Sequence, residues 1–493
     1  MAESIKRRTF VKGAALTGAT VAVAGLAGCS YKEAADARKN PESVDTYDLV
    51  VLGTGGAGLC AAIAAHDDGA KNVVIIEKMP VAGGNTMHSS SGMNASETAA
   101  QKKAGIEDTN ELFISDTYSG GHNVGEMPLI EYMCDHSNDA IEWLSDHGIV
   151  LDNLGKMGGA SVKRCHRPTD GSAVGLTLVP GLLKNVDERN IPVLYNRRAT
   201  KLITSGDAVT GVVVEDEDGE TTTFNAKAVV IATGGFGYNR TWIEKYKPEI
   251  KDFPSTNTSG SMGDGCAIAE AVGAKLVDMQ YIQTHPTVEQ TTSTLVAEAI
   301  RGAGAIMVNS QAKRFYTEEG TRDMVSNAEL EQPGKFSWCV FDQTVFDKYK
   351  ACSKYKKMGL TKESDTLEGL AKECELDAAT FAATVADWNS VVKGEKTDDF
   401  GRTPQETVKP IETPTFYAVK IAPGIHHTMG GIHVNTDAQA LRSDESVIPG
   451  LYAAGEVTGG LHGANRLGGN AVCDIVVNGL HAGKNAAAYI AGK

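Results

Sequence analysis

The hydrophobic pattern opens with a short apolar run that stops at a glycine turn. Residues Tyr47–Leu52 are mostly apolar, as in a buried parallel strand. The glycine-rich stretch 53–58 follows at once, and Leu59–Asp67 has the periodicity of a helix. A second apolar run, Asn72–Ile76, ends at the acidic residue Glu77. This order of strand, glycine turn, helix, strand and acid predicts one βαβ unit.

This βαβ unit has every part of a dinucleotide-binding motif. The glycines of a GxGxxG turn permit the close approach of a pyrophosphate, whose charge faces the helix N-terminus. Glu77 stands where an acidic residue accepts the hydroxyls of a ribose. We therefore predict a dinucleotide site, and the unit by itself does not separate FAD from NAD.

Three later glycine turns indicate one long ligand. The apolar run 228–232 leads into a Thr-Gly-Gly turn, Gly263-Asp264-Gly265 opens a further helix, and the run 450–454 ends at Gly455-Glu456. Each turn alone is ordinary turn chemistry. Together they favour a tightly held flavin.

Composition and charge narrow the class of protein. The 493 residues predict two or three domains at about 150 residues each. The 54 glycines exceed the usual share of about 7%, which suits a backbone packed against a large cofactor. A net charge of −15 argues against nucleic-acid binding, because neutralising phosphates needs clustered Lys and Arg.

The first 29 residues have the pattern of an export signal. Lys6, Arg7 and Arg8 precede a weakly apolar run that ends in Leu-Ala-Gly-Cys29, the pattern of a twin-arginine signal with a lipoprotein cleavage site. We expect export to the periplasm or cell surface, a lipid anchor on Cys29 as the one membrane contact, and a polar tether over residues 30–46.

Cysteine spacing bears on the source of electrons. The nine cysteines form no CxxC or CxxCH motif, so we expect neither a c-type haem nor an iron–sulfur cluster within the chain. Cys60 and Cys473 lie in apolar helical patterns and are interpreted as packing residues. The electrons are expected from an external donor, either a cytochrome c or a flavin carrier.

Seven further motifs together carry a family resemblance. They are, in chain order, Gly83-Gly84-Asn85-Thr86, His166-Arg167-Pro168-Thr169, Gln283-Thr284-His285-Pro286-Thr287, Glu298-Ala299-Ile300-Arg301-Gly302, Thr321-Arg322-Asp323, His426-His427-Thr428-Met429-Gly430-Gly431 and His462-Gly463-Ala464-Asn465-Arg466-Leu467-Gly468-Gly469-Asn470. In this order the sequence resembles the soluble fumarate reductase flavoprotein family, which includes flavocytochrome c flavin domains and urocanate reductases. The motifs are specific for the superfamily and less so for the substrate.

The resemblance implies an α/β fold. Its core is a doubly wound, Rossmann-like FAD domain in two sequence segments, 47–279 and 427–493. A capping α+β domain, 280–426, is inserted between them, with the active site at the interface. The mixed periodicity of 360–393 is interpreted as surface helices of that domain.

The resemblance also implies the chemistry, namely reduction of the carbon–carbon double bond of a small 2-enoic acid. Arg466 and His426 clamp one carboxylate and His285 holds the far end of the substrate. Hydride comes from flavin N5, and a proton comes from Arg322, relayed through Glu298 and Arg301. On spacing alone, Glu298 and Arg301 are an i,i+3 surface pair. Such an enzyme is a terminal reductase of anaerobic respiration.

The expected cofactor contacts combine the glycine turns with the family motifs. They are Gly53, Gly55, Gly56, Ala57, Gly58, Glu77, Lys78, Gly84, Asn85, Thr86, Gly92, Thr233, Gly234, Asp264, His427, Glu456, Arg466, Ala471 and Val472. The turn Thr428, Met429 and Gly430, with Glu456 and Thr458, resembles a sodium site of some family members. No metal ligand set is assigned, because backbone-ligand sites are read poorly from sequence.

Two departures from the family pattern bear on which acid is the substrate. Fumarate reductases commonly carry Met and Thr where this chain has Leu295 and Ala297, so a hydrogen-bond donor to the distal carboxylate is missing. His285 stands where urocanate reductases tend to have Tyr. Fumarate is the leading expectation, with a substituted acrylate close behind.

Two alternatives stay open at this point. One is a dehydrogenase of the same superfamily, for example of the ketosteroid type, which introduces a double bond. The other is a surface flavoprotein that only carries electrons. Reoxidation of the reduced flavin by an unsaturated acid separates both from a reductase.

Overall fold

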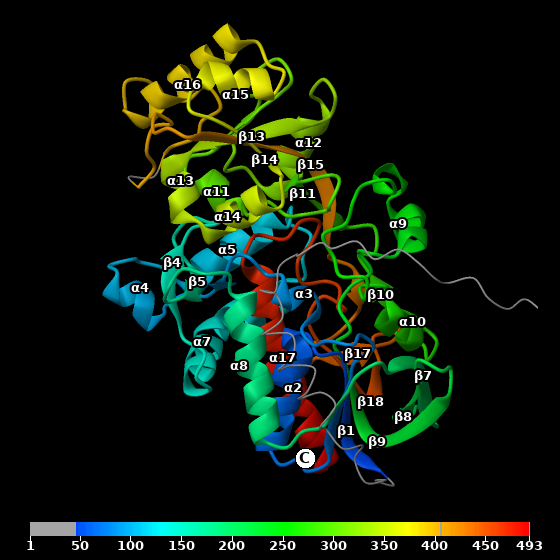
Figure 1. The fold of residues 1–493 in the computed structure, drawn as a ribbon. Coiled ribbons are helices and arrows are strands. Elements are labelled where there is room, and N and C mark those ends of the chain that lie inside the picture. The colour runs from blue at the N-terminus through cyan, green and yellow to red at the C-terminus, as the bar shows by residue number, and fades with distance from the viewer. Residues whose placement is uncertain (1–45, 405–406, 493) are drawn as a thin grey trace, which may run out of the picture. The chain divides into compact units, whose positions relative to one another are not determined.

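The computed structural model describes residues 46–404 and 407–492 (Figure 1). The predicted signal, the proposed lipid anchor at Cys29 and all of the tether except residue 46 lie outside this range. None of the helices in the described ranges has the length and apolar character needed to cross a bilayer.

An eight-stranded sheet carries the predicted dinucleotide unit. Its main order is β17 (Gln439–Leu441), β18 (Val447–Ala453), β9 (Thr221–Ile231), β1 (Tyr47–Leu52), β2 (Val73–Ile76) and β6 (Val193–Leu194), with β7 (Arg198–Ser205) and β8 (Ala208–Glu215) joined through β9. The strands from β18 to β6 are parallel. Their carboxyl ends therefore meet at one edge, where ligands bind in doubly wound folds.

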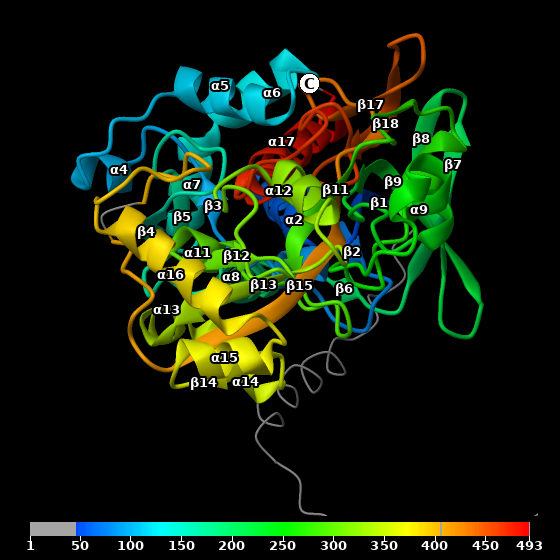
Figure 2. The same cartoon turned by 90° about the horizontal axis from the view of Figure 1, so that it is seen from above.

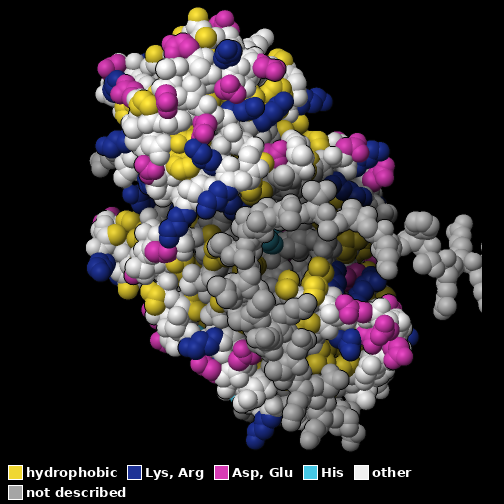
Figure 3. Space-filling view, in the orientation of Figure 1, with side chains coloured by type: hydrophobic (Ala, Val, Ile, Leu, Met, Phe, Trp, Pro, Cys, Tyr) yellow, Lys and Arg dark blue, Asp and Glu magenta, His cyan; other side chains and the backbone are white. Residues whose placement is uncertain are grey.

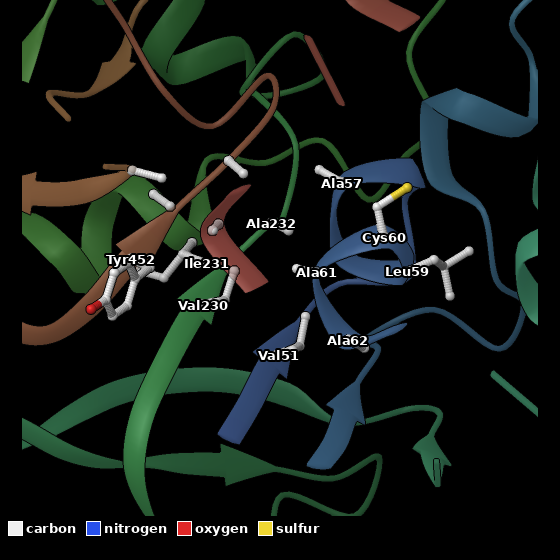
Figure 4. Packing of buried hydrophobic residues seen from close by; sticks show 14 of the residues in the cluster. Val51, Ala57, Leu59, Cys60, Ala61, Ala62, Val230, Ile231, Ala232 and Tyr452 are labelled. Atoms are coloured by element: carbon white, nitrogen blue, oxygen red, sulfur yellow. The ribbon is translucent and has the colours of Figure 1, made fainter. Parts of the chain in front are cut away.

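The helices α2 (Gly56–Asp67) and α17 (Asn470–Ile490) pack on each other and on this sheet, and α8 (Gly175–Glu188) packs beside α2 (Figures 1 and 2). Leu59, Cys60 and Ala61 of α2 pack near Val51 and Val230 of the sheet (Figure 4). An added Cβ at Gly483 of α17 would lie 2.2 Å from the carbonyl oxygen of Ala61. Glycine is thus required for α17 to approach α2, and Cys60 is a packing residue, as predicted.

A separate five-stranded antiparallel sheet, with its own helices, forms the second part of the fold. Its order is β11 (Ile282–Val288), β15 (Phe416–Thr428), β13 (Ser337–Asp342) and β12 (Ile306–Val308), with β14 (Thr361–Ser364) on β15. Its helices are α11 (Glu298–Gly302), α12 (Arg322–Leu330), α13 (Gln343–Lys348), α14 (Lys350–Lys357), α15 (Leu367–Glu373) and α16 (Ala378–Val392). Two hydrophobic clusters, around Trp388 and around Phe341, fill it separately from the core of the first sheet.

The remaining elements surround these two sheets. They are the three-stranded sheet β3 (Met93–Asn94), β5 (Cys165–Pro168) and β4 (Leu151–Gly155), the pair β10 (Leu276–Val277) and β16 (Gly431–Ile432), and the helices α3 (Gly84–Met87), α4 (Ala99–Lys103), α5 (Asn110–Gly120), α6 (Met127–Asp135), α7 (Ser137–Asp146), α9 (Arg240–Tyr246), η1 (Pro248–Ile250) and α10 (Asp264–Glu270). The fold class is mixed α/β, as predicted. On the face shown in Figure 3, acidic and basic side chains are interspersed.

The prediction of surface helices throughout 360–393 is wrong in two respects. Residues Thr361–Ser364 form the strand β14 because β15 offers them an edge to pair with. The helix α16 is not a surface helix alone, since Phe381, Val385 and Trp388 are fully buried along one face.

Candidate active site

A cavity lies at the carboxyl ends of the parallel strands, beside the N-terminus of α2. Thirteen of the predicted cofactor residues line it, namely Gly53, Gly55, Gly56, Ala57, Glu77, Lys78, Gly84, Asn85, Thr86, Thr233, Gly234, Asp264 and Glu456. Thr54, Arg197, Arg198, Thr258 and Ser261 line it as well. Thr54 stands inside the GxGxxG turn but was not predicted, because only the small residues of that turn were expected to contact the cofactor; the other four lie outside the glycine motifs.

The backbone around this cavity fits a dinucleotide such as FAD. An added Cβ at Gly58 would lie 2.0 Å from the carbonyl oxygen of Gly53, so the turn closes only with glycine. At Gly84 and Gly234 an added Cβ would meet no protein atom, which leaves room there for a ligand. The buried hydroxyl of Thr233 lacks a hydrogen-bond partner among the described residues, as expected where a ligand supplies one.

Charged side chains in the cavity wall are paired with one another. Asp264 accepts from Lys78 Nζ at 2.6 Å and from Arg198 Nη2 at 2.8 Å. Glu77 accepts from the backbone N–H groups of Thr54 at 2.9 Å and Met79 at 2.8 Å. The acid at the end of β2 therefore both holds the glycine turn and faces the cavity.

The other predicted cofactor residues do not line this cavity. Gly58 packs on Gly53, and Gly92 packs against the backbone of His166 on β5. Ala471 and Val472 stand in the first turn of α17. His427 is buried, its Nδ1 lies 3.5 Å from Glu456 and its Nε2 has no hydrogen-bond partner among the described residues.

Arg322 and Glu298 form a buried ion pair. The guanidinium donates from Nε at 2.8 Å and from Nη2 at 2.6 Å to the same oxygen, Glu298 Oε2. The two residues are the first of α12 and α11 respectively. Burial is the largest single effect and acts to raise the pKa of Glu298, but Arg322, His285 and Arg301 together outweigh it and hold that pKa well below its ordinary value. This carboxylate is therefore ionised at neutral pH.

Arg301 does not share this ion pair. It is 1% exposed, and its Nη1 donates to the backbone oxygen of Glu318 at 2.6 Å. No hydrogen bond joins it to Glu298 in the described ranges, and its Nε has no partner there. The i,i+3 surface pair considered from spacing is wrong, because Arg301 is buried and the Glu298 side chain, 10% exposed, pairs with Arg322.

His285 is held as a neutral hydrogen-bond donor. Its Nδ1 accepts the backbone N–H of Thr287 at 3.2 Å, which leaves the proton on Nε2. That Nε2 lies 3.7 Å from Glu298 Oε2 and makes no hydrogen bond to the described residues. Burial is the main reason that the pKa of His285 falls from 6.5 to about 3.

His426 and Arg466 complete the cluster. The rings of His426 and His285 meet edge to face at 5.1 Å, and Thr256 contacts His426 Nδ1 at 2.8 Å. Arg466 is 5% exposed, and burial with Arg322 nearby lowers its pKa to about 9. Its Nη1 donates to the Leu467 carbonyl, whereas its Nε lacks a partner in the described part of the chain. A buried guanidinium with a free donor indicates an anion site.

Gln283 and Gly468 are site residues that spacing did not single out. Gln283 accepts from Arg322 Nη1 at 3.1 Å and donates to the Arg466 carbonyl at 2.7 Å, so it couples the two arginines. A Cβ at Gly468 would lie 3.2 Å from Arg322 Nη2, so glycine lets this loop approach the ion pair. Both stand inside the family motifs, which is the signal that could have found them.

The turn predicted to resemble a sodium site is internally hydrogen-bonded. The Thr428 N–H donates to Glu456 at 3.1 Å, and the Thr458 hydroxyl donates to the Gly455 carbonyl at 2.8 Å. Within the described ranges, no group of three or more His, Cys, Asp and Glu side chains is placed to hold a metal ion. Sodium stays a prediction.

Comparison with known proteins decides the family. The family model for the FAD binding domain matches residues 48–472. This chain belongs to that FAD-binding family. FAD is accordingly its cofactor, which agrees with the fit of the cavity.

Relatives within the FAD-binding family are oxidoreductases. The NADH:fumarate oxidoreductase of Klebsiella pneumoniae is 46% identical over 92% of this chain, which spans 49% of that relative. The fumarate reductase (cytochrome) of Shewanella frigidimarina is 44% identical over 90% of this chain and 78% of its own length. The open conformation of a flavocytochrome c3 fumarate reductase is 41% identical with a TM-score of 0.76, covering 94% of this chain and 81% of that one. This chain is an FAD-dependent oxidoreductase similar to fumarate reductases.

The burial of neutral His285 predicts a specific acid sensitivity. The pKa of His285 in the folded chain lies below the ordinary 6.5. Between these two pKa values the imidazole is protonated in the unfolded chain and neutral in the folded chain. The free energy of unfolding should therefore fall as pH drops from 6.5 towards 3. In His285→Gln that slope should be shallower by up to about 1.4 kcal/mol per pH unit.

Urea unfolding of the holoprotein at pH 7.0, 6.0 and 5.0 measures this slope. The matched control is His136→Gln, because His136 is exposed. Equal slopes in the parent and His285→Gln would show that His285 titrates normally in the folded state.

Proposed function

We propose that this protein reduces the carbon–carbon double bond of a small 2-enoic acid, either fumarate or a substituted acrylate. The observation that carries the proposal is the cluster of buried cations around Arg466. Arg322 and Arg466 lie near one another with Glu298 as the hydrogen-bonded carboxylate of Arg322. Burying an unbalanced charge is costly, so the cluster favours a ligand that brings a carboxylate.

Arg466 and His426 are the proposed clamp for one substrate carboxylate. A guanidinium presents a planar fork that matches a carboxylate, and the unpartnered Nε of Arg466 supplies one donor of such a fork. His285 offers its Nε2–H from the β11 side of the cluster. Together they orient the double bond and stabilise negative charge that builds beside it.

When bound in its reduced form, FAD supplies the hydride for one olefinic carbon. The second carbon then needs a proton, and Arg322 is the proposed donor. Arginine is normally always protonated, so it can give up a proton only as negative charge develops on the substrate and only if the proton is replaced at once. Its double contact with Glu298 provides a partner for that replacement.

The substrate preference is proposed to follow from the segment just before Glu298. Ala297 carries no hydroxyl, and its N–H donates to Tyr355 Oη at 3.0 Å. Tyr355 Oη in turn donates to the Leu295 carbonyl at 3.0 Å, which fixes the segment. Because residue 297 offers no side-chain donor, the site accepts substrates whose distal group is less polar than the second carboxylate of fumarate, as well as fumarate itself.

A capping domain, an electron donor and an export route are proposed together with this reaction. The separate hydrophobic clusters of the second sheet support a capping domain over 280–426. An external cytochrome c or flavin carrier is proposed as the electron donor, as in a terminal reductase of anaerobic respiration. Export by the twin-arginine route and anchoring at Cys29 rest on the N-terminal sequence.

Anaerobic stopped-flow reoxidation tests this function and the proton donor together. The holoprotein is reduced with dithionite and mixed with fumarate, methacrylate, cinnamate or urocanate. We expect fast reoxidation by fumarate or methacrylate. In Arg322→Lys the rate should fall at least about 100-fold, because one ammonium cannot replace three guanidinium contacts.

Arg240→Lys is the matched control, since Arg240 is exposed. FAD content should be equal in all three proteins. If no acid reoxidises the reduced flavin, the reductase proposal is wrong, and a dehydrogenase or an electron carrier is favoured. A rate in Arg322→Lys within a few-fold of the parent would remove Arg322 as donor.

Ala297→Thr tests the proposed basis of substrate preference. The restored hydroxyl should raise kcat/KM for fumarate relative to methacrylate by about fivefold, as one hydrogen bond of about 1 kcal/mol allows. Ala297→Val, similar in shape but without the hydroxyl, is the control. Because residue 297 is also the N-cap of α11, a higher melting temperature with an unchanged kcat/KM ratio would mean that the hydroxyl caps the helix and does not reach substrate.

A further inference from the structure

A group of basic side chains, which we name the basic face, lies on the β4–β5 connection, on β5 and on α13 and α14. Its members are Lys163, Arg167, Lys348, Lys350 and Lys354. Lys and Arg side chains gather over α14 on the face shown in Figure 3. Burial, followed by the charges of Arg167 and Lys163, lowers the pKa of Lys348. Positive charges from separate elements therefore meet on this face.

Acidic side chains balance the basic face only in part. Lys350 lies 3.4 Å from Asp170, but both side chains are exposed, and such pairs contribute little. Asp347 is the neighbouring acid and accepts from Gln343 at 2.7 Å. The other four basic members form no ion pair with any described residue. Because the whole chain has a net charge of −15, the sign of the charge is reversed locally, and the face attracts an anionic partner.

The basic face adjoins α3, which forms a wall of the cofactor cavity. Gly84, Asn85 and Thr86 of this helix line the cavity. His88, the C-cap of α3, is exposed. Partial burial and then the charge of Lys354 lower the pKa of His88, which places α14 next to the end of α3. A protein bound over α3 would therefore lie beside the FAD site.

Two exposed apolar side chains flank α3. Val81, just before this helix, is 66% exposed, and Leu176, in the first turn of α8, is 63% exposed. The Gly175 N–H donates to the Ser89 carbonyl at 3.1 Å, so the start of α8 is joined to the segment after α3. Apolar side chains next to charges of one sign are typical of surfaces that bind a protein partner.

We propose that the basic face, together with Val81 and Leu176, is the docking site of the electron donor, and that this donor is a small carrier protein with an acidic surface. The inference deepens the proposed function, because it names the chemistry of the partner that such a reductase needs. Each reduced carrier loses one electron on docking. Two such encounters, with two protons from water, convert bound FAD to its two-electron-reduced form.

A carrier protein fits this surface better than the substrate does. The acid-binding cluster comes from β11, α11, α12, β15 and the loop before α17, and none of these elements carries a member of the basic face. The exposed Val81 and Leu176 would not assist the capture of a small anion. Charges arranged around an apolar contact beside a cofactor suit the weak, fast encounters of redox proteins.

Reduction of the oxidised holoprotein by reduced flavodoxin, a small acidic carrier, tests the docking site. Stopped-flow mixing without oxygen is followed by the long-wavelength absorbance of the one-electron-oxidised flavodoxin. In Lys348→Glu/Lys354→Glu the second-order rate constant should fall at least about tenfold at low ionic strength. The difference should shrink at about 0.5 M salt, where exposed charges are screened.

The matched control is Lys372→Glu/Lys484→Glu, which makes the same change of net charge at two exposed lysines outside the basic face. Its rate constant should stay within twofold of the parent, with equal FAD content and melting temperature in all three proteins. Leu176→Ser tests the apolar part separately, and its rate constant should be lower than that of the parent at every salt concentration.

Three results would overturn the inference. One is an equal rate constant in the parent and Lys348→Glu/Lys354→Glu, or a parent that flavodoxin does not reduce. Another is slower reoxidation by fumarate in this variant with normal reduction by flavodoxin, since the face would then steer the substrate. The third is weaker binding to phosphatidylglycerol vesicles with normal reduction by flavodoxin, which would assign the face to a membrane.

The flavodoxin experiment reads the reduction of FAD and needs no turnover of an acid. Its failure would therefore leave the proposed reductase function in place with a different donor site. A parent that flavodoxin reduces through the basic face but that no acid reoxidises would instead support the docking site and remove the reductase proposal.

Discussion

The two hydrogen bonds from Arg322 to one oxygen of Glu298 are the interaction on which the proposed site depends. It joins the first residues of two short helices, and both side chains are largely removed from water. Breaking such a pair would leave an uncompensated buried charge, typically at a cost of about 3–5 kcal/mol. The contact therefore fixes α11 against α12, and with them the wall that carries Leu295 and Ala297.

A second constraint is that positive charge in this region exceeds the carboxylates bonded to it. Burial is the largest cause that lowers the pKa of His426 and of His427; the next is Arg322 for His426 and Arg466 for His427. The histidines of the cluster are therefore neutral and act as hydrogen-bond donors, and the positive charge resides on the guanidinium groups. Such an arrangement suits a substrate whose carboxylate is fixed and whose charge grows during the reaction.

The sequence predicts well what is encoded locally and poorly what depends on tertiary contact. The unit from Tyr47 to Glu77 is confirmed because strand, turn and helix signals lie within one window. The strand β14 was missed because its state is decided by its partner β15. The burial of Glu298 and Arg301 was likewise unreadable from spacing, since a five-residue helix presents them to different neighbours. The hydrogen bond from the Gly158 N–H to Glu298 likewise joins segments about 140 residues apart, a contact that spacing does not predict.

The most direct test of the account is a binding titration that involves no turnover. Oxidised holoprotein is titrated with mesaconate or succinate at constant ionic strength, and binding is followed by the flavin difference spectrum. We expect saturable binding that weakens at least about tenfold in Arg466→Met, with FAD retained, because the carboxylate loses a charge-assisted hydrogen bond. Equal affinity in the parent and Arg466→Met would show that the buried guanidinium of Arg466 does not bind the substrate carboxylate.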